Sequence, residues 1–72
     1  MKKENIQQYY EEKNLIKIVL KDSYNFSGRI KEINDDSLIF IDKFNSAVTI
    51  SLSEIAYIVL LNNKKTLNEV KN

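Results

Sequence analysis

The feature that most limits how this chain can fold is a set of five short apolar runs, separated by polar residues that favour turns. The runs lie at residues 15–21, 24–33, 38–42, 47–51 and 55–61. In the first two runs apolar and polar residues alternate, which is typical of half-buried β-strands. Gly28, the only glycine of the chain, falls within the second run and predicts a sharp bend there. These features predict a mostly β fold, in which five antiparallel strands form a small, strongly bent barrel.

Residues 2–14 differ from the rest, because their apolar residues recur with the period of a helix. Ile6, Tyr9 and Tyr10 stand at i, i+3 and i+4 and so share one face of the predicted helix. Asn5 and Gln8 resemble a capping box, and Asn14 is of a type that often ends helices. A helix of about three turns is marginally stable alone. We therefore expect it to dock on the barrel as a lid.

The composition excludes several classes of protein. Seventy-two residues fit one small domain, which we assign to residues 1–61, and residues 62–72 read as a polar, flexible tail. The chain has neither cysteine nor histidine, so we expect no metal site and no cofactor. No apolar run is long enough to cross a membrane, and the N-terminus does not resemble a secretory signal. We therefore expect a cytoplasmic protein without membrane partners.

Catalysis is not expected either. The adjacent carboxylates Asp35–Asp36 and Glu11–Glu12 fall in segments predicted to be exposed, without a histidine, cysteine or glycine-rich loop nearby. Catalytic carboxylates need burial or a partner that shifts their pKa. Solvated surface charges explain both pairs more simply, so we assign no catalytic residue.

The size of the chain favours self-association. A single core in so small a domain seldom gives more than about 3–5 kcal/mol of stability without disulfides or a metal. The run at 55–61 carries no charge or proline to protect a strand edge, so we expect it to pair with the fourth strand of a neighbouring copy. This head-to-tail contact closes into a ring when the rotation allows. The predicted interface residues are Ile50, Tyr57, Ile58 and Val59.

The order of these elements resembles the Sm-like family, and within it the Hfq family of bacterial RNA chaperones. The resemblance covers residues 5–61 and rests on Asn5-Ile6-Gln7 before the helix, on the hairpin at 18–28, on the turn at 34–38 and on Ile55-Ala56-Tyr57-Ile58. It implies an SH3-like barrel with the Sm-like fold and a homohexameric ring. It also implies post-transcriptional regulation through single-stranded A/U-rich RNA, with small regulatory RNA and mRNA as partners.

Two RNA-binding elements of most Hfq proteins are changed in this sequence. Their Tyr-Lys-His-Ala-Ile segment is matched by Ser51-Leu52-Ser53-Glu54-Ile55, which lacks the cationic side chains. Their arginine-rich helix patch is matched by Glu11-Glu12-Lys13. Because contacts from Lys and Arg to phosphate dominate affinity for RNA, an alternative function stays open: a protein-interaction ring with weak or no RNA binding.

The resemblance and the residue types indicate two candidate RNA-binding surfaces. The first, on the first hairpin at the distal face of the ring, comprises Val19, Lys21, Asp22, Ser23, Tyr24, Asn25, Ser27 and Arg29. The second, on the pore face, comprises Gln7, Gln8, Ser37 and Ser53. A non-functional explanation stays open for each, because strand aromatics usually pack, strand charges are usually solvated and Gln8 is also a candidate helix cap. An aromatic platform nevertheless suits RNA, since stacking contributes about 1–3 kcal/mol per base.

Overall fold

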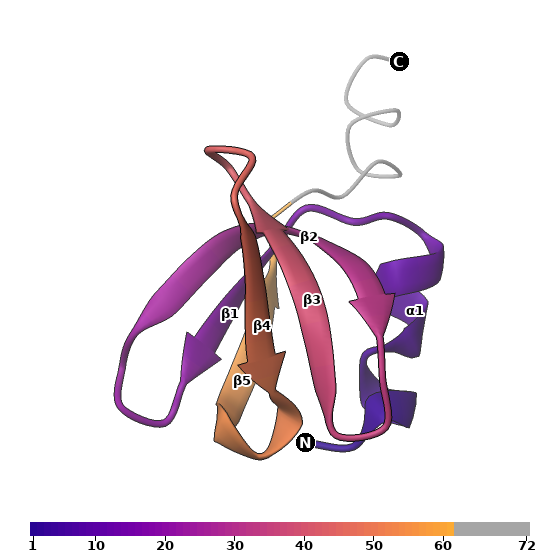
Figure 1. Ribbon diagram of the computed structural model, residues 1–72, viewed down its shortest axis with the longest axis vertical. Helices are drawn as coiled ribbons and strands as arrows, with labels where there is room; N and C mark the ends of the chain where they lie inside the picture. Colours follow the sequence, from indigo (N-terminus) through magenta and orange to yellow (C-terminus); the bar gives the residue numbers. More distant parts are fainter. Residues whose placement is uncertain (62–72) are drawn as a thin grey trace, which may run out of the picture.

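The structure, a computed structural model, describes residues 1–61, and the predicted tail at 62–72 lies outside the described residues. The chain starts with a 3₁₀ helix η1 (Lys3–Asn5) and an α-helix α1 (Gln7–Glu11), shown in Figure 1. The strands are β1 (Ile16–Leu20), β2 (Asn25–Ile33), β3 (Ser37–Asp42), β4 (Ala47–Ser51) and β5 (Ile55–Leu60), with a 3₁₀ turn η2 (Leu52–Glu54) before β5. The predicted order of one helix and five strands is confirmed, with each strand within one residue of its predicted bounds.

The strands form one antiparallel sheet in the order β4-β3-β2-β1-β5. β2 is the longest strand, and Figure 1 shows it curving across the molecule from the β1–β2 turn toward α1. At Gly28 the neighbouring strand comes very close: a Cβ there would overlap the carbonyl oxygen of Ile41 and lie 2.8 Å from the Cα of Asp42. The register with β3 then shifts between Ile30 and Glu32, which is a β-bulge. The predicted bend is confirmed, and the bulge adds to it.

The core lies inside the bent sheet and is apolar throughout the described part of the chain. It draws on every strand, because the alternating residues of each strand send one side chain in two to the inner face. Its buried members are Ile6, Ile16, Ile18, Ile30, Leu38, Phe40, Ile50, Leu52 and Ile55. Burial of each such side chain contributes roughly 1.5–3 kcal/mol. The core thereby holds the turns at both ends of the strands in place.

The beginning of the helix differs from the prediction. α1 covers Gln7–Glu11 rather than residues 2–14, and no side chain caps its N-terminus. The amide of Gln8 instead donates to the Glu12 carboxylate at 2.9 Å, so the predicted capping box with Asn5 is wrong. Ile6, which precedes α1, is completely buried. This segment is therefore part of the core rather than only a lid, because Ile6 fills the open end of the bent sheet.

The end of the helix is set by backbone geometry. Lys13 adopts a left-handed conformation with φ 55°. Its N–H donates to the carbonyl of Tyr10 at 3.2 Å, and the Asn14 N–H donates to the carbonyl of Tyr9 at 3.1 Å. These two bonds form a Schellman motif, which satisfies carbonyls that a helix end leaves free. The helix therefore stops before the predicted Asn14.

β5 differs from its prediction in burial. Its nearly continuous apolar sequence predicts burial on both faces, yet only Ile55 is buried within the protomer and Ile58 is half-buried. Tyr57, Leu60 and Leu61 are 54%, 43% and 47% exposed. β5 lies at one end of the sheet, so a single copy of the chain offers it a strand partner on one side only.

Candidate nucleic-acid interface

The β1–β2 turn holds the exposed part of the first predicted surface. Ser23 adopts φ 77°, and its N–H donates to the carbonyl of Leu20 at 2.9 Å. The Asp22 carboxylate accepts from the N–H of Tyr24 at 2.9 Å, which is an Asx turn. Residues 21–25 are all exposed. We call residues 21–25 the hairpin site; its backbone is fixed by hydrogen bonds while its side chains remain accessible.

Tyr24 is the side chain of the hairpin site best suited to contact a base. It directly precedes β2, and its ring meets that of Phe26 edge to face with centroids 5.1 Å apart. Phe26 packs against the core, whereas Tyr24 is 62% exposed. The packing interpretation therefore fits Phe26, and Tyr24 has an aromatic surface free for stacking and one edge supported by Phe26.

The remaining residues of the first surface lie apart from the turn. Val19 and Ser27 are half-buried within β1 and β2. Arg29 is farther along β2, and its Nε donates to the carbonyl of Lys13 at the end of the helix, at 3.0 Å. The structure therefore brings Lys21, Asp22, Ser23, Tyr24 and Asn25 together, and it turns the Arg29 side chain toward the helix.

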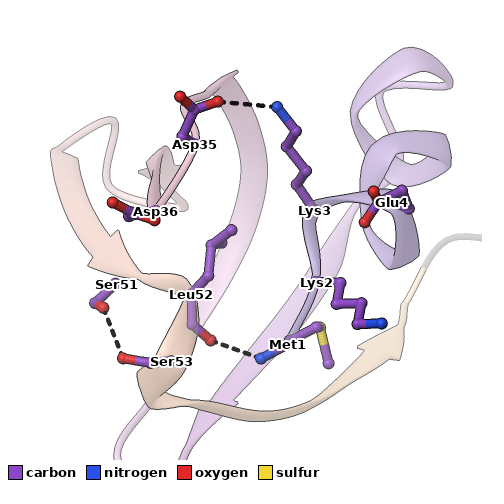
Figure 2. Close-up of a pocket in the computed structure, with 9 residues that line it drawn as sticks. All are labelled: Met1, Lys2, Lys3, Glu4, Asp35, Asp36, Ser51, Leu52 and Ser53. Atoms are coloured by element: carbon purple, nitrogen blue, oxygen red, sulfur yellow. Dashed lines mark hydrogen bonds and ion pairs between the residues drawn. The ribbon is translucent and has the colours of Figure 1, made fainter.

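A separate hollow of about 680 Å³ lies where the N-terminal segment, the β2–β3 turn and η2 meet (Figure 2). We call it the N-terminal pocket. Its lining residues are Met1, Lys2, Lys3, Glu4, Asp35, Asp36, Ser51, Leu52 and Ser53. Backbone bonds join its walls: the N–H of Leu52 donates to the carbonyl of Asp36 at 2.9 Å, and the Met1 amine donates to the carbonyl of Leu52 at 3.0 Å.

The charges of the N-terminal pocket balance. It has three carboxylates, of Glu4, Asp35 and Asp36, and three ammonium groups, of Lys2, Lys3 and the N-terminus at Met1. Lys3 donates to Asp35 at 3.0 Å. This hydrogen bond, and then the attraction of the Asp35 charge, raise the pKa of Lys3 above its ordinary 10.5. With one ammonium group so engaged, the pocket has little capacity to hold phosphate.

The predicted pore-face residues meet only partly in this pocket. Ser53 lines it, and its hydroxyl lies 3.0 Å from that of Ser51. Ser37 is half-buried at the start of β3. Gln7 and Gln8 instead donate along the helix to Glu11 and Glu12, at 3.2 and 2.9 Å. No sequence pattern predicted that the lining residues would share a pocket, because they come from three segments far apart in the chain.

The predicted interface residues divide into two groups. Tyr57 and Val59 are exposed on β5. Ile58 packs against the core, and the Ile50 side chain is buried with 3% exposed. Only the main chain of Ile50 is therefore available at the free edge of β4, because its side chain is buried in the core of its own protomer.

Metal binding and membrane crossing can also be assessed from residues 1–61. In this part of the chain no group of three or more carboxylates is arranged to hold a metal ion. The helices found there are also too short and too polar to cross a membrane.

Comparison with known proteins identifies the fold. No family model and no curated protein sequence matches the chain. The N-terminal helix and five antiparallel strands in a bent sheet form the Sm-like fold. A crystal structure of the pleiotropic translational regulator Hfq is similar to this chain with a TM-score of 0.72 and 9% sequence identity. The similarity covers 81% of this chain and 95% of that one. At this identity the comparison establishes a shared fold.

Proposed function

We propose that the chain assembles into a homohexameric Sm-like ring that binds single-stranded A/U-rich RNA. In this proposal it acts in the cytoplasm as an RNA chaperone in post-transcriptional regulation, with small regulatory RNA and mRNA as partners and without catalysis. The observation that carries the proposal is the Sm-like fold that the chain shares with Hfq, a translational regulator. The number of six subunits rests on the family resemblance.

The edges of the sheet support the ring. Within residues 1–61, the outer edges of β4 and β5 have no partner strand. β5 also exposes Tyr57 and Leu60, and Leu61 directly after it is exposed as well; such apolar exposure is unusual at a free strand edge. Pairing of β5 with β4 of the next copy satisfies both edges and covers part of this apolar surface.

The hairpin site supports RNA as the ligand. Tyr24 presents a supported aromatic surface, and Lys21, Ser23 and Asn25 beside it supply a charge and polar groups. Unstacked bases bind to such platforms in single-stranded RNA. A ring repeats the site in every subunit, which raises the overall affinity through multivalency.

One observation favours the alternative of a protein-interaction ring. The N-terminal pocket has no excess of cationic groups, since three carboxylates balance its three ammonium groups, and the whole chain has a net charge of only +1. Capture from a lysate with and without nuclease separates the two functions. Prey that persists after nuclease treatment favours the alternative, whereas prey held through RNA is lost.

RNA binding is tested by titration of labelled oligo-A and oligo-U into the protein at low salt. The proposal expects saturable binding below about 10 μM, from the strength of repeated stacking and phosphate contacts. Tyr24→Ala should weaken oligo-A binding and leave the assembly intact, whereas Tyr24→Phe, which keeps the ring, should bind almost normally. Absence of saturable binding, or equal affinity of both variants, contradicts the proposal.

The assembly is tested by native mass. Tyr57→Lys should shift the particle to smaller species with an unchanged protomer fold, because the side chain is exposed in the protomer. Ile58→Lys is a less specific probe, since Ile58 packs against the core. A wild-type protein that remains an 8.4 kDa monomer contradicts the ring.

A further inference from the structure

The side of the β1–β5 pair that faces away from the core is largely apolar. The two strands lie side by side and antiparallel, with Val19 opposite Tyr57 and Lys17 opposite Val59 (Figure 1). Opposite residues of a strand pair send their side chains to the same face of the sheet. Ile18, between Lys17 and Val19, is buried in the core. Because side chains alternate along a strand, its two neighbours and their partners on β5 lie on the outer face.

The same surface continues just beyond the ends of the two strands. The N–H of Leu61 donates to the carbonyl of Leu15 at 2.9 Å, which extends the pairing by one more residue on each side. Tyr57, Val59 and Leu61 are 54%, 37% and 47% exposed. Pairing at the strand edge uses main-chain groups, so it covers these side chains only in part. The surface, which we call the outer β1–β5 face, consists of Leu15, Lys17, Val19, Tyr57, Val59 and Leu61.

Lys17 is the one charged residue of the outer β1–β5 face. It is half-buried and lies between Leu15 and Val19 in the sequence. The ion pair found within residues 1–61 joins Lys3 to Asp35, so Lys17 has no carboxylate partner in this part of the chain. A charge that is covered without a partner costs free energy. An occupant of this face should therefore supply apolar side chains together with a carboxylate.

The chain itself contains a segment of this composition, the tail at residues 62–72, which directly follows Leu61. Its apolar residues are Leu67 and Val70, and Glu69 carries its single acidic side chain. A carboxylate between two apolar residues is complementary to a face that presents one ammonium group among apolar side chains.

The tail is long enough to reach the whole face. The segment from Leu61 to Leu67 spans up to about 20 Å when extended. Tyr57 lies about 13 Å back from Leu61 along β5, at the rise of a strand. Because the tail and the face belong to one chain, the effective concentration of the tail is about millimolar. A separate protein does not have this advantage.

We propose that the tail docks on the outer β1–β5 face of its own protomer. Leu67 and Val70 pack against the apolar side chains of the face, and Glu69 pairs with Lys17. A second copy of the face is a poorer occupant, because two copies placed face to face bring Lys17 against Lys17, and like charges repel. The inference goes beyond the proposed function and requires neither the ring nor RNA.

The contact is tested with a spin label on the tail. The chain has no cysteine, so Asn72→Cys carries a single nitroxide. In the full chain with isotope-labelled methyl groups, the nitroxide should broaden the NMR signals of Val19 and Val59. The signal of Ile33, at the end of β2, is the internal reference and should stay sharp. The measurement is made without RNA, so its result is independent of the proposed function.

Variants in the spin-labelled chain test the chemistry of the contact. Leu67→Asn/Val70→Asn should abolish the broadening, because it removes the apolar side chains of the tail. Lys17→Glu should reduce the broadening, and Lys17→Glu/Glu69→Lys, which exchanges the two charges, should restore it. Lys31→Glu changes a β2 lysine outside the face and is the matched control, which should keep the wild-type broadening.

The docking is overturned if the wild-type chain shows no broadening at Val19 and Val59, or if the broadening survives Leu67→Asn/Val70→Asn. Failure of the charge exchange to restore the signal loss overturns the pairing of Glu69 with Lys17. Dilution of the labelled chain into excess unlabelled protein identifies the source of the tail. Broadening that persists supports the chain's own tail, whereas broadening that disappears assigns the contact to a second copy and overturns the proposal.

Discussion

The N-terminal pocket and the two hollows that share residues 29–31 of β2, which we name together the β2 groove, differ in their charge. In the pocket three carboxylates are balanced by three ammonium groups, and Lys3 is bonded to Asp35. The groove gathers four cations, none paired with a carboxylate in the described structure, and one of its two carboxylates is engaged in a turn. A net charge of +1 over the whole chain conceals this separation. The kind of partner that each hollow can bind therefore depends on where the folded chain places its charges rather than on their sum.

The pocket and the groove also differ in how they are built. Backbone hydrogen bonds from segments far apart in sequence hold the pocket together, as between Leu52 and Asp36. The groove follows one strand, and its shape depends on the bend of β2 at Gly28 and on the bulge after Ile30. A change in β2 should therefore alter the groove more directly than the pocket.

The largest expected effect comes from the floor of the groove. Gly28→Val places a Cβ against the backbone of Ile41 and Asp42, which cannot move without separating β2 from β3. We expect a loss of about 3 kcal/mol in the free energy of unfolding, at the upper end of the usual cost of overpacking, measured by urea denaturation. The neighbouring Ser27→Ala should change it by less than about 0.5 kcal/mol. Wild-type stability of the Gly28→Val protein would mean that β2 and β3 can move apart at this point without loss of stability.

The next effect concerns the anchor of Arg29. Arg29→Met removes the hydrogen bond to the Lys13 carbonyl and should cost about 0.5–1.5 kcal/mol of stability. Amide hydrogen exchange should become faster at the end of α1, near Lys13 and Asn14. Lys31→Met, which removes a groove charge without such a bond, serves as the control and should leave exchange there unchanged. Equal exchange in both variants would show that Arg29 is not anchored.

A smaller effect is expected from the carboxylates of the N-terminal pocket. Asp35→Asn with Asp36→Asn removes two negative charges from the N-terminal pocket. In water, each carboxylate repels an RNA phosphate about 10 Å away by about 0.4 kcal/mol. Removal of both repulsions should therefore raise the affinity for oligo-U about four-fold at low salt. The gain should vanish near 1 M salt, where the screening length is about 3 Å. A gain that persists at high salt would indicate a direct contact instead.

The smallest effect is that of the exposed ion pair in the pocket. Asp35 raises the pKa of Lys3, so while the Asp35 carboxylate is ionised the pair stabilises the fold below the ordinary value of 10.5 and loses this effect as the pH rises through the raised pKa. Lys3→Met should lower the melting temperature only slightly at pH 7, because exposed pairs contribute little. The difference from wild type should shrink above pH 10.5. A constant difference at all pH values would assign it to packing.

The strands could be predicted well because their signals are local. Alternation of apolar and polar residues sets the face of each strand, and Asp22, Ser23, Asn45 and Ser46 mark tight turns. The helix was predicted less well, because no side chain caps its N-terminus and the amide of Gln8 donates to Glu12 instead. Ile6 reads as a helix-face residue in sequence and is a core residue in the structure.

The candidate sites show the same limit. Tyr24 was identified from a hairpin pattern, and the local Asx turn explains why it is exposed. Arg29 was grouped with that hairpin, but a bond to a residue sixteen positions away redirects its side chain. Lys43 and Phe44 could not be predicted as part of a site, because a lysine next to an aromatic residue is common in sequences. Only the structure shows that Lys43 lies in one hollow with Arg29 and Lys31.

By itself the sequence determined the number and order of the strands, the bend at Gly28 and the absence of histidine and cysteine chemistry. These properties depend on residue type and on spacing along the chain, which the sequence contains directly. Three properties depend on the tertiary structure: which charged residues line the same hollow, the burial of Ile50 in the core, and the hydrogen bond that turns Arg29 toward the helix. Such neighbours come from different elements, and the curvature of β2 determines how close they lie.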